Sequence, residues 1–492
     1  MLERKWWTLV VVCLAIFMLL LDITIVNVAL PPIARDLGAT FTDLQWVIDA
    51  YALTLATFVL NAGSLADLLG RKRVFIGGVV LFTAASVLCG AATSPLFLIL
   101  SRAGQGIGGA IMFATSLALL SQEFQGRERG TAFGIWGATT GAAVAVGPLI
   151  GGALTTYLSW RWIFFVNIPI GIVATILSVA QLRETLDEEH GGIDWIGLVT
   201  LSASLFMIVF ALLRGNEKGW TSVLIVGMFA GGAALLLAFV LSQHYGRRAM
   251  IDLSLFTRPA FTGAQITAFA LSCAVFATFL YLTLYLQNDL GYSAIQTGVR
   301  FLPITVLSFV CAAASGTLTA RVPVRFLLAV GLALCAVGLF LLRDITATSG
   351  WTTLLPGFVL MGAGIGVTNP ALASTAIAVV PPARAGMASG TNNTFRQVGI
   401  ATGIAAYGAI FEHHIRAAFP GIRTEQLNAF ASGRFNVGNA PKGVVHQVQT
   451  TFIGGLHELF VVGTCIAAVG AVLALTLVRR RDFAAATAPA QG

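Results

Sequence analysis

The stretch GSLADLLGRKR, residues 63–73, closes the second of about fourteen apolar segments, each long enough to cross a membrane. Gly63 allows two backbones to approach closely, Asp67 stands where an apolar helix would leave the membrane, and Gly70 permits a tight reversal. The basic run after Gly70 is typical of the cytoplasmic side. An acid at a helix end beside a basic turn can hold one helix bundle against another. The residues predicted to form a cytoplasmic gate are Gly63, Asp67, Gly70, Arg71 and Lys72.

The composition is that of a membrane protein. Of the 492 residues, 57% are hydrophobic and 10% are charged, whereas a soluble domain carries about a quarter charged residues. The net charge of +8 is concentrated in connections expected to face the cytoplasm, so it sets topology and does not indicate a nucleic-acid partner. We expect a multi-pass protein of a bacterial inner (plasma) membrane, embedded in the lipid bilayer with both termini in the cytoplasm.

An internal repeat predicts two related halves. GTLTARVPVR (316–325) repeats the start of GSLADLLGRK, with Ala320 in place of Asp67. Transporters built from repeats bind their substrate between the repeats. The predicted fold is therefore all-α, with two six-helix bundles plus two inserted helices, fourteen transmembrane helices in all. The expected units are an N-terminal bundle at 1–186, an inserted pair at 187–250 and a C-terminal bundle at 251–492.

The one long connection, at about 413–453, is expected to be extracellular. Its glycines from Gly438 to Gly443 suggest a β-hairpin. Such a connection could be a lid over an outer vestibule or a plain solvated connector.

Three ionisable residues fall inside the predicted spans, where a charge is costly and therefore a functional candidate. Asp22 lies roughly 22 Å along the first segment, counted from the cytoplasmic side. The second and fourth segments run in from the outside, and along them Asp49 lies roughly 8 Å and Arg102 roughly 10 Å from the outer end. The hydrocarbon core of a bilayer is about 30 Å thick, so all three residues are expected in one layer of its outer half. Burial favours a neutral carboxyl group and a nearby guanidinium favours the charged one, so this layer predicts proton coupling. A static ion pair is the alternative.

The fifth segment carries GATTGAAVAVGPLIGG (137–152). Proline removes a backbone donor, and glycines leave a groove without side chains, so a bent and tightly packed helix is expected. Ordinary small-residue packing would leave the same pattern. The residues predicted to matter are Gly147, Pro148, Gly151 and Gly152.

The thirteenth segment holds ASGTNNTFRQVGIATG (388–403), with Arg396 near mid-membrane. Neighbours at i and i+4 share a helix face, so a polar, cationic strip is predicted that either faces a cavity or pairs with a helix end or an acid. The residues predicted to line a substrate cavity are Tyr51, Trp136, Tyr281, Asn393, Arg396 and Gln397.

No metal or cofactor site is expected. The six cysteines lie in apolar segments without metal-type spacing, which indicates packing. The G-x-G-x-x-G in SRAGQGIGGA (101–110) follows no strand, so it does not predict a dinucleotide site. Its glycines indicate close helix packing.

Together these motifs resemble the major facilitator superfamily, and specifically its 14-helix drug:proton antiporter branch (EmrB/QacA type). LDITIVNVALP (21–31) is characteristic of that branch. GSLADLLGRKR is similar to the superfamily motif between segments 2 and 3, SRAGQGIGGA to its segment 4 arginine motif, and GPLIGG to its antiporter motif. Further matches are WRWIFFVNIPIG (160–171), LYLQNDLGYSAIQTGVRFLP (284–303) and ASGTNNTFRQVGIATG.

The resemblance implies alternating-access export driven by inward proton flow, with the proton gradient in place of a cofactor. It assigns protonation to Asp22, with Arg102 beside it, and the gate to Asp67 and Arg71. Some relatives that export lipophilic cations carry extra acids in the C-terminal half. Here segment 9 has none, and segment 13 shows Asn392, Asn393 and Arg396 instead. This argues against a preference for dications and leaves neutral or anionic antibiotics at least as good candidates.

The expected function is a monomeric, proton-coupled exporter of amphipathic drugs or antibiotics. An exporter of an endogenous metabolite or lipid is the first alternative, because sequence does not separate the two. A non-transporting membrane receptor would have no need for the intramembrane charges together with the gate motif. An enzyme is not expected, because the six histidines are scattered and no nucleophile–base set is apparent.

Overall fold

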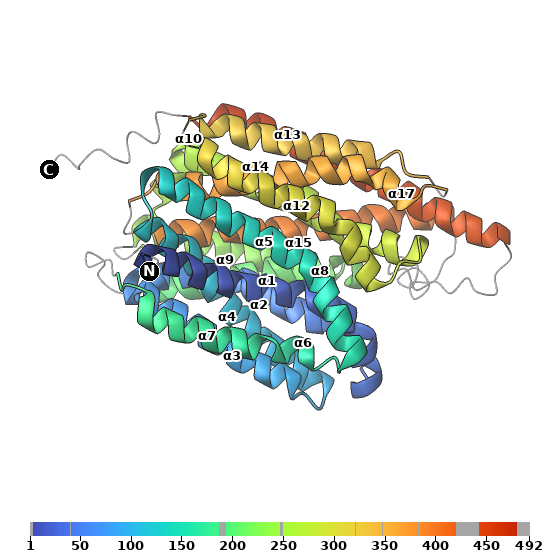
Figure 1. Cartoon of the computed structure of the whole chain (residues 1–492), viewed down its shortest axis with the longest axis horizontal. Coiled ribbons are helices and arrows are strands. Elements are labelled where there is room, and N and C mark those ends of the chain that lie inside the picture. Colours follow the sequence, from blue (N-terminus) through green and yellow to red (C-terminus); the bar gives the residue numbers. More distant parts are fainter. Residues whose placement is uncertain are drawn as a thin grey trace.

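The computed structural model describes residues 3–39, 41–185, 193–246, 249–319, 321–346, 348–381, 384–419 and 442–479. Within these ranges the chain is helical and contains no strand. The long helices run side by side as one bundle (Figure 1). The first residues of α1 and the last of α17 lie at the same end, which we call the terminal face (Figure 1).

The helices before residue 186 are α1 (Arg4–Leu37), α2 (Phe41–Leu69), α3 (Arg71–Gly90), α4 (Pro95–Glu123), α5 (Gly126–Tyr157), α6 (Trp162–Phe165) and α7 (Asn167–Gln181). Local signals explain several of these boundaries. α1 ends at Gly38, which takes the left-handed conformation of a helix C-cap (φ 62°). α4 begins after Ser94, whose hydroxyl accepts from the amide of Phe97, with Pro95 in the first turn.

The next pair is α8 (Trp195–Lys218) and α9 (Val223–Tyr245). The rest of the chain forms η1 (Leu253–Thr257), α10 (Pro259–Leu271), η2 (Ser272–Phe276), α11 (Ala277–Leu284), η3 (Tyr285–Asp289), α12 (Ala294–Leu318), α13 (Val324–Leu342), η4 (Trp351–Leu354), α14 (Leu355–Ala378), α15 (Ala385–Ala418) and α17 (Lys442–Leu477). η2 and η3 are π-helical turns: η2 interrupts the apolar span Pro259–Gln287, and η3 ends just beyond it.

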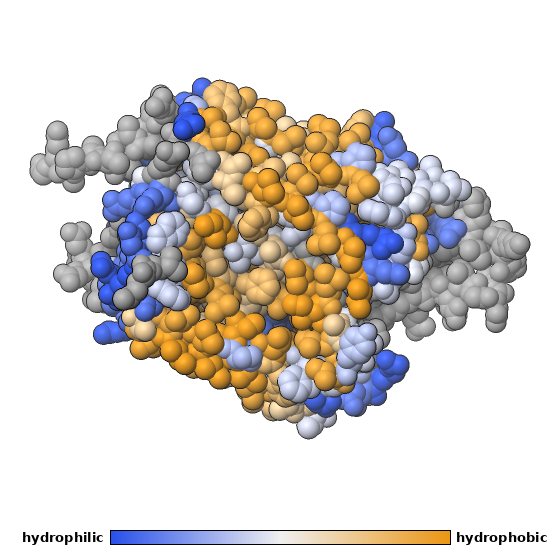
Figure 2. All heavy atoms as spheres, viewed as in Figure 1, coloured by the Kyte–Doolittle hydropathy of each residue, from blue (hydrophilic) through white to orange (hydrophobic). Residues whose placement is uncertain are grey.

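Twelve described segments are long and apolar enough to cross a membrane by length and composition. α5 and α15 do not meet that composition test, but they have 32 and 34 residues and run in the same bundle. They would bring the described candidates to fourteen, and the count of fourteen transmembrane helices stays a prediction. Apolar side chains form a broad band between two hydrophilic ends (Figure 2), as a surface in contact with lipid requires.

The helices of each half bury their own apolar cluster. One is built chiefly from α1 to α5 and α7, and another from α10 to α17. Between the halves α5 packs along α12, and α2 packs along α15. α8 also packs against both α2 and α15. We call the α4–α5 contact with α14–α15 the seam. The predicted divisions near 187 and 250 fall beside residues 186–192 and 247–248, which lie outside the described residues.

The predicted loop at 413–453 is too long. α15 continues to Ala418 and α17 already begins at Lys442. Contacts between the two helices explain the extension: Phe411 stacks edge-on to Phe452 at 5.0 Å, and His414 Nδ1 lies 2.9 Å from Glu458 Oε1. Hydropathy marks only the apolar part of such helices. Residues 442 and 443 of the predicted hairpin are helical, and 420–441 lie outside the described residues.

Candidate functional site

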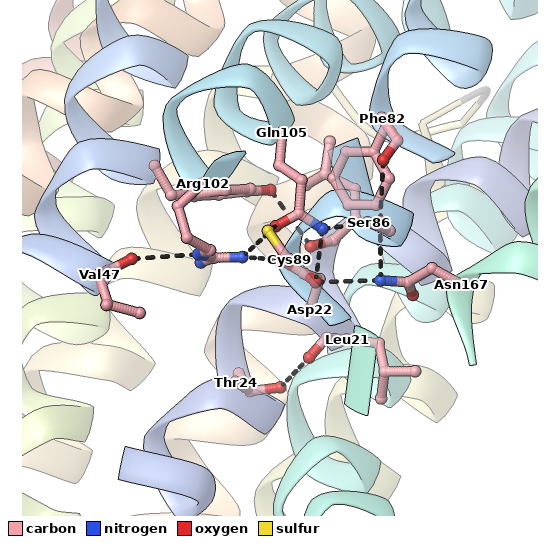
Figure 3. A network of polar contacts seen from close by, with 12 residues as sticks. Leu21, Asp22, Thr24, Val47, Phe82, Ser86, Cys89, Arg102, Gln105 and Asn167 are labelled. Carbon is pink, nitrogen blue, oxygen red and sulfur yellow. Dashed lines mark hydrogen bonds and ion pairs between the residues drawn. The ribbon is translucent and has the colours of Figure 1, made fainter. Parts of the chain in front are cut away.

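Three donors from two other helices converge on the Asp22 carboxylate of α1 (Figure 3). The Arg102 Nη1 atom of α4 makes an ion pair with Asp22 Oδ2. Gln105 Nε2, one turn further along α4, donates to Asp22 Oδ1 at 3.2 Å. Asn167 Nδ2, at the start of α7, donates to the same oxygen at 3.0 Å. The exposed fraction of Asp22 is 0%, so in this conformation the carboxylate is closed off from water.

Arg102 is held on its other sides as well. Its Nε donates to the carbonyl oxygen of Val47 at 3.1 Å, and its Nη1 donates to Gln105 Oε1 at 2.8 Å. The guanidinium carbon lies 4.3 Å from the centre of the Tyr51 ring, within reach of a cation–π interaction. Arg102 therefore joins α1, α2 and α4 at one point, and the structure brings together Asp22 and Arg102, which the sequence places at one depth. Their role in proton coupling stays a prediction.

The sequence analysis missed the amides of this network. Gln105 Nε2 also donates to Ser86 Oγ at 2.7 Å, and the Cys89 thiol donates to Gln105 Oε1 at 3.2 Å. Cys89 thus has a polar contact that the packing interpretation did not include. The signal was present, because Gln105 follows Arg102 by three residues and shares its helix face. Asn167 lies within a stretch that was quoted for the resemblance alone.

Asp49 does not join this network. Val47 and Tyr51 of α2 face Arg102. Asp49 lies two residues from each of them and therefore projects about 200° away around the helix. Its Oδ2 lies 3.4 Å from Nη2 of Arg214 on α8, a residue that the sequence analysis did not single out. Arg214 is 2% exposed, pairs with Glu217 and lies 4.3 Å from the Trp46 ring centre. The structure thus separates Asp49 from Asp22.

At the terminal face Asp67 connects the two halves. Its Oδ1 accepts from Arg71 Nε at 2.9 Å and from the amide of Gly386 at 3.0 Å, and its Oδ2 accepts from the amide of Met387 at 2.8 Å. These amides belong to the first turn of α15, whose preceding residue Arg384 supplies no side-chain cap. The first amides of a helix lack partners within it and favour a negative charge. Asp67 therefore caps α15 from α2.

The glycines around Asp67 let the backbones meet. A Cβ on Gly63 would lie 2.2 Å from the carbonyl oxygen of Gly386, a distance that no side chain tolerates. Gly70 has φ of 104°, which an L residue rarely adopts. Lys72 contributes differently from the prediction, because its Nζ donates to the Val179 carbonyl within the same half at 2.8 Å.

The small residues of α5 press against α1 and α12. A Cβ on Gly147 would lie 1.9 Å from Thr24 Oγ1, and one on Gly151 would lie 2.7 Å from Ile25 Cγ1. A Cβ on Gly152 would lie 2.8 Å from Ile295 Cγ1 of α12. Thr24 and Ile25 lie two and three residues after Asp22, so α5 packs against the part of α1 that carries the buried acid. The Pro148 side chain lies outside the described residues.

Two of the predicted cavity residues belong to packed interiors. Tyr51 is 3% exposed and lies against Arg102 in the Asp22 network. Tyr281 is 6% exposed and packs against Tyr407 and Phe411 inside the second half. The pattern of apolar segments identifies aromatic residues but does not say which side of a helix faces the other half. In this conformation both tyrosines pack within their own half, and a place in a substrate cavity stays a prediction for both.

The other predicted cavity residues lie at or near the seam. Asn393 Nδ2 of α15 donates to the Phe113 carbonyl of α4 at 3.2 Å, and Phe113 stacks with Trp136 of α5 at 6.2 Å. Arg396 Nη2 donates to Asn369 Oδ1 of α14 at 2.6 Å. Gln397, the next residue, is half-buried. Trp136, Asn393 and Arg396 are thus brought together from two halves.

A family model describes most of this chain. The model of the Major Facilitator Superfamily matches residues 12–404. The chain belongs to the major facilitator superfamily. Its bundle of membrane-spanning helices is the fold of that superfamily, whose members are transporters and not enzymes.

Bacterial resistance and export proteins are similar to this superfamily member along most of their length. The multidrug resistance protein Stp of Mycobacterium tuberculosis is 33% identical over 483 residues, which cover 94% of this chain and 90% of the relative. The puromycin resistance protein pur8 of Streptomyces alboniger is 36% identical, covering 83% of this chain and 82% of the relative. The tetracenomycin C resistance and export protein of Streptomyces glaucescens is 30% identical, covering 96% and 91%.

A solved major facilitator structure has the same fold. The human organic anion transporter MFSD10 (TETRAN) matches with a TM-score of 0.64, covering 95% of this chain and 100% of its own. The sequence identity is 15%, so this likeness concerns the fold alone.

Proposed function

We propose that this major facilitator protein exports amphipathic drugs or antibiotics in exchange for protons, by alternating access. The observation that carries the proposal is the buried Asp22, which binds one guanidinium and two amides from α4 and α7. An ionisable group at membrane depth is costly and is kept where it serves transport. The relatives described above are drug and antibiotic resistance or export proteins, which supports the export of drugs and antibiotics.

A proton can act on this network through the contacts that it removes. When Asp22 binds a proton, its negative charge disappears and the ion pair with Arg102 is lost. Arg102 also holds α2 through Val47 and Tyr51, so this change loosens α1, α2 and α4 together. In the present conformation Asp22 is closed off, and proton exchange therefore requires the helices to separate.

The moving bodies in this proposal are the N-terminal bundle (1–186) and the C-terminal bundle (251–492), with 187–250 as the inserted pair. The contact of Asp67 with the first turn of α15 would act as the cytoplasmic gate between them, together with the close approach of Gly63. The small residues of α5 would seal the pathway against leak. The protein would lie in the inner membrane as a monomer, with both termini in the cytoplasm.

The direct test is proton-driven transport by Asp22→Asn in everted membrane vesicles. We expect the variant to be expressed normally and to lose drug accumulation, because an amide neither gains nor releases the coupling proton. The control is Asp344→Asn, which removes an exposed carboxylate paired with Arg343 outside the network. Full accumulation by Asp22→Asn would remove Asp22 from the coupling mechanism.

A further inference from the structure

Several buried polar atoms at and beside the seam have no hydrogen-bond partner among the residues that the structure describes. They include Nε1 of Trp136 on α5 and, on α15, Oδ1 of Asn393 and Nε of Arg396. A buried polar group without a partner is unusual and needs an explanation, such as a ligand or water that another state supplies. Three such atoms near one interface indicate a surface that binds something when the halves open.

The residues around these atoms form a closed ring across the seam. Asn393 bonds to Phe113, Phe113 stacks on Trp136, and Trp136 is followed by Gly137. A Cβ on Gly137 would lie 3.6 Å from the Cβ of Asn369, which bonds to Arg396. Arg396 follows Asn393 by three residues on the same face of α15. α4 and α5 therefore contribute the aromatic side of the ring, and α14 and α15 contribute the polar side.

Arg396 differs from the other buried arginines. Among the described residues the arginines classed as buried are Arg71, Arg102, Arg214 and Arg396. The first three pair with Asp67, Asp22, and both Asp49 and Glu217, respectively. Arg396 is 7% exposed, and no carboxylate of the described chain lies within ion-pair distance of it. It donates instead to the neutral amide of Asn369.

We infer that Arg396 binds an anionic group of the transported molecule, a carboxylate or a sulfonate, while Phe113 and Trp136 contact its aromatic or apolar part. This inference rests on the proposed export function and names its substrate class. A buried guanidinium without a counter-charge is unfavourable and gains most from an anion, which it can bind through two parallel N–H donors. Asn369 fixes one of its nitrogens and so orients the others. A cationic substrate would be repelled at the same place.

The ring is closed in this structure, because Trp136 and Asn393 are 0% exposed. Access requires α5 to move away from α14, a contact formed by Gly137 against Asn369 and Pro370. The same movement gives Trp136 Nε1 and Asn393 Oδ1 the partners that they lack here. Binding of an anion is thus coupled to the separation of the halves.

Two xanthene dyes of opposite charge test the inference: fluorescein, an anion, and rhodamine 123, a cation. Binding to the purified full-length protein is followed by fluorescence anisotropy. We expect wild type to bind fluorescein and Arg396→Gln to bind it at least roughly tenfold more weakly. Arg396→Lys should retain part of the affinity, because it keeps the charge but loses the planar fork. Rhodamine 123 should bind to Arg396→Gln as well as, or better than, to wild type.

The matched control is Arg416→Gln, which removes the same charge from the same helix at an exposed position beside Glu412. It should leave fluorescein binding unchanged. The apparent melting temperature of each variant identifies a fold defect, and Arg396→Lys tests the charge should Arg396→Gln prove unstable. Equal fluorescein affinity in wild type and the Arg396 variants, or no fluorescein binding by wild type, overturns the inference.

Dye accumulation in everted vesicles separates this inference from the proposed function. Accumulation of rhodamine 123 that depends on Asp22, without fluorescein binding by wild type, would refute the anion site and leave proton-coupled export standing. Fluorescein binding that depends on Arg396, without proton-driven accumulation of either dye, would support the anion site and refute the export mechanism.

Discussion

Asp289 ends the π-helical turn η3, two residues beyond the apolar span Pro259–Gln287. Its Oδ2 is buried and has no hydrogen-bond partner in the described part of the chain, and burial raises the pKa of Asp289 to about 7. The folded protein therefore holds this proton more tightly than the unfolded chain does. The contribution of this protonated carboxyl group to stability is therefore fully present below its ordinary pKa near 4. It is lost as the pH rises to the folded-state pKa of about 7.

Asp289→Asn should stabilise the protein at pH 8 by about 1–3 kcal/mol, because an amide carries no charge to bury. At pH 4 the two proteins should unfold alike. The measurement is the apparent melting temperature in detergent between pH 4 and pH 8. Asp344→Asn, which changes an exposed carboxylate, should leave the pH profile of wild type unchanged. A constant difference between wild type and Asp289→Asn across this range would contradict the assignment.

The sequence predicts the charges of the site better than their partners. Asp22 and Arg102 could be found because a charge within an apolar span is rare. Gln105 and Asn167 could not be selected in the same way, because amides are common in helices and only the fold brings them to Asp22. Arg214 was missed because it lies just past the apolar run of its helix, where a charge looks solvated.

At the element scale, the inserted pair does more than extend the chain. Arg214 near the end of α8 bonds to α2 through Asp49, and Asn216 Nδ2 donates to the Ala405 carbonyl of α15 at 3.1 Å. α8 is therefore attached to both halves near the end opposite the terminal face. The hydropathy pattern predicts the existence of α8 but not its partners, since these depend on contacts far apart in the sequence.

Arg214→Gln should lower stability by roughly 3 kcal/mol, because it leaves Asp49 and Glu217 without their buried cation. Asp49→Asn should cost less, since Arg214 keeps Glu217. The double variant should lose less stability than the two single variants lose together. Thermal unfolding of wild type, the two single variants and the double variant measures this coupling. Arg343→Gln breaks an exposed pair and should cost at most about 1 kcal/mol. Strict additivity would mean that Asp49 and Arg214 do not interact.

The crossing of α2 and α15 depends on Gly63. Gly63→Ala places a methyl group where the carbonyl oxygen of Gly386 lies 2.2 Å away, so the helices must separate at a cost of about 1–3 kcal/mol. We expect faster hydrogen exchange in the first turn of α15 and weaker drug efflux. Gly77→Ala on α3 is the matched control, because its methyl group would meet nothing within 4 Å. Unchanged exchange in Gly63→Ala would show that this crossing does not hold the halves together.

At the scale of the whole molecule, the repeat seen in the sequence reappears as a second crossing. Gly316 stands where Gly63 stands in the first copy, and a Cβ on Gly316 would lie 2.2 Å from the carbonyl oxygen of Gly130. α12 and α5 thus cross at the terminal face as α2 and α15 do. The first copy has Asp67 in addition, and the second copy has Ala320 at that place. The halves are therefore related in backbone packing, while the sequence of the second copy has no acid at the position of Asp67.

The placement of charge predicts how the molecule sits in its membrane. Basic residues recur at the terminal face, among them Arg4, Lys5 and Arg71, and cytoplasmic loops carry such an excess. Ser254 is exposed near this face, between α9 and α10, whereas Val223 is 91% exposed at the opposite end. A membrane-impermeant maleimide applied to intact cells should therefore label Val223→Cys and not Ser254→Cys. Permeabilised cells should label both, which controls for the reactivity of Ser254→Cys. Labelling of Ser254→Cys alone in intact cells would invert the topology, and with it the face at which Asp67 closes the pathway.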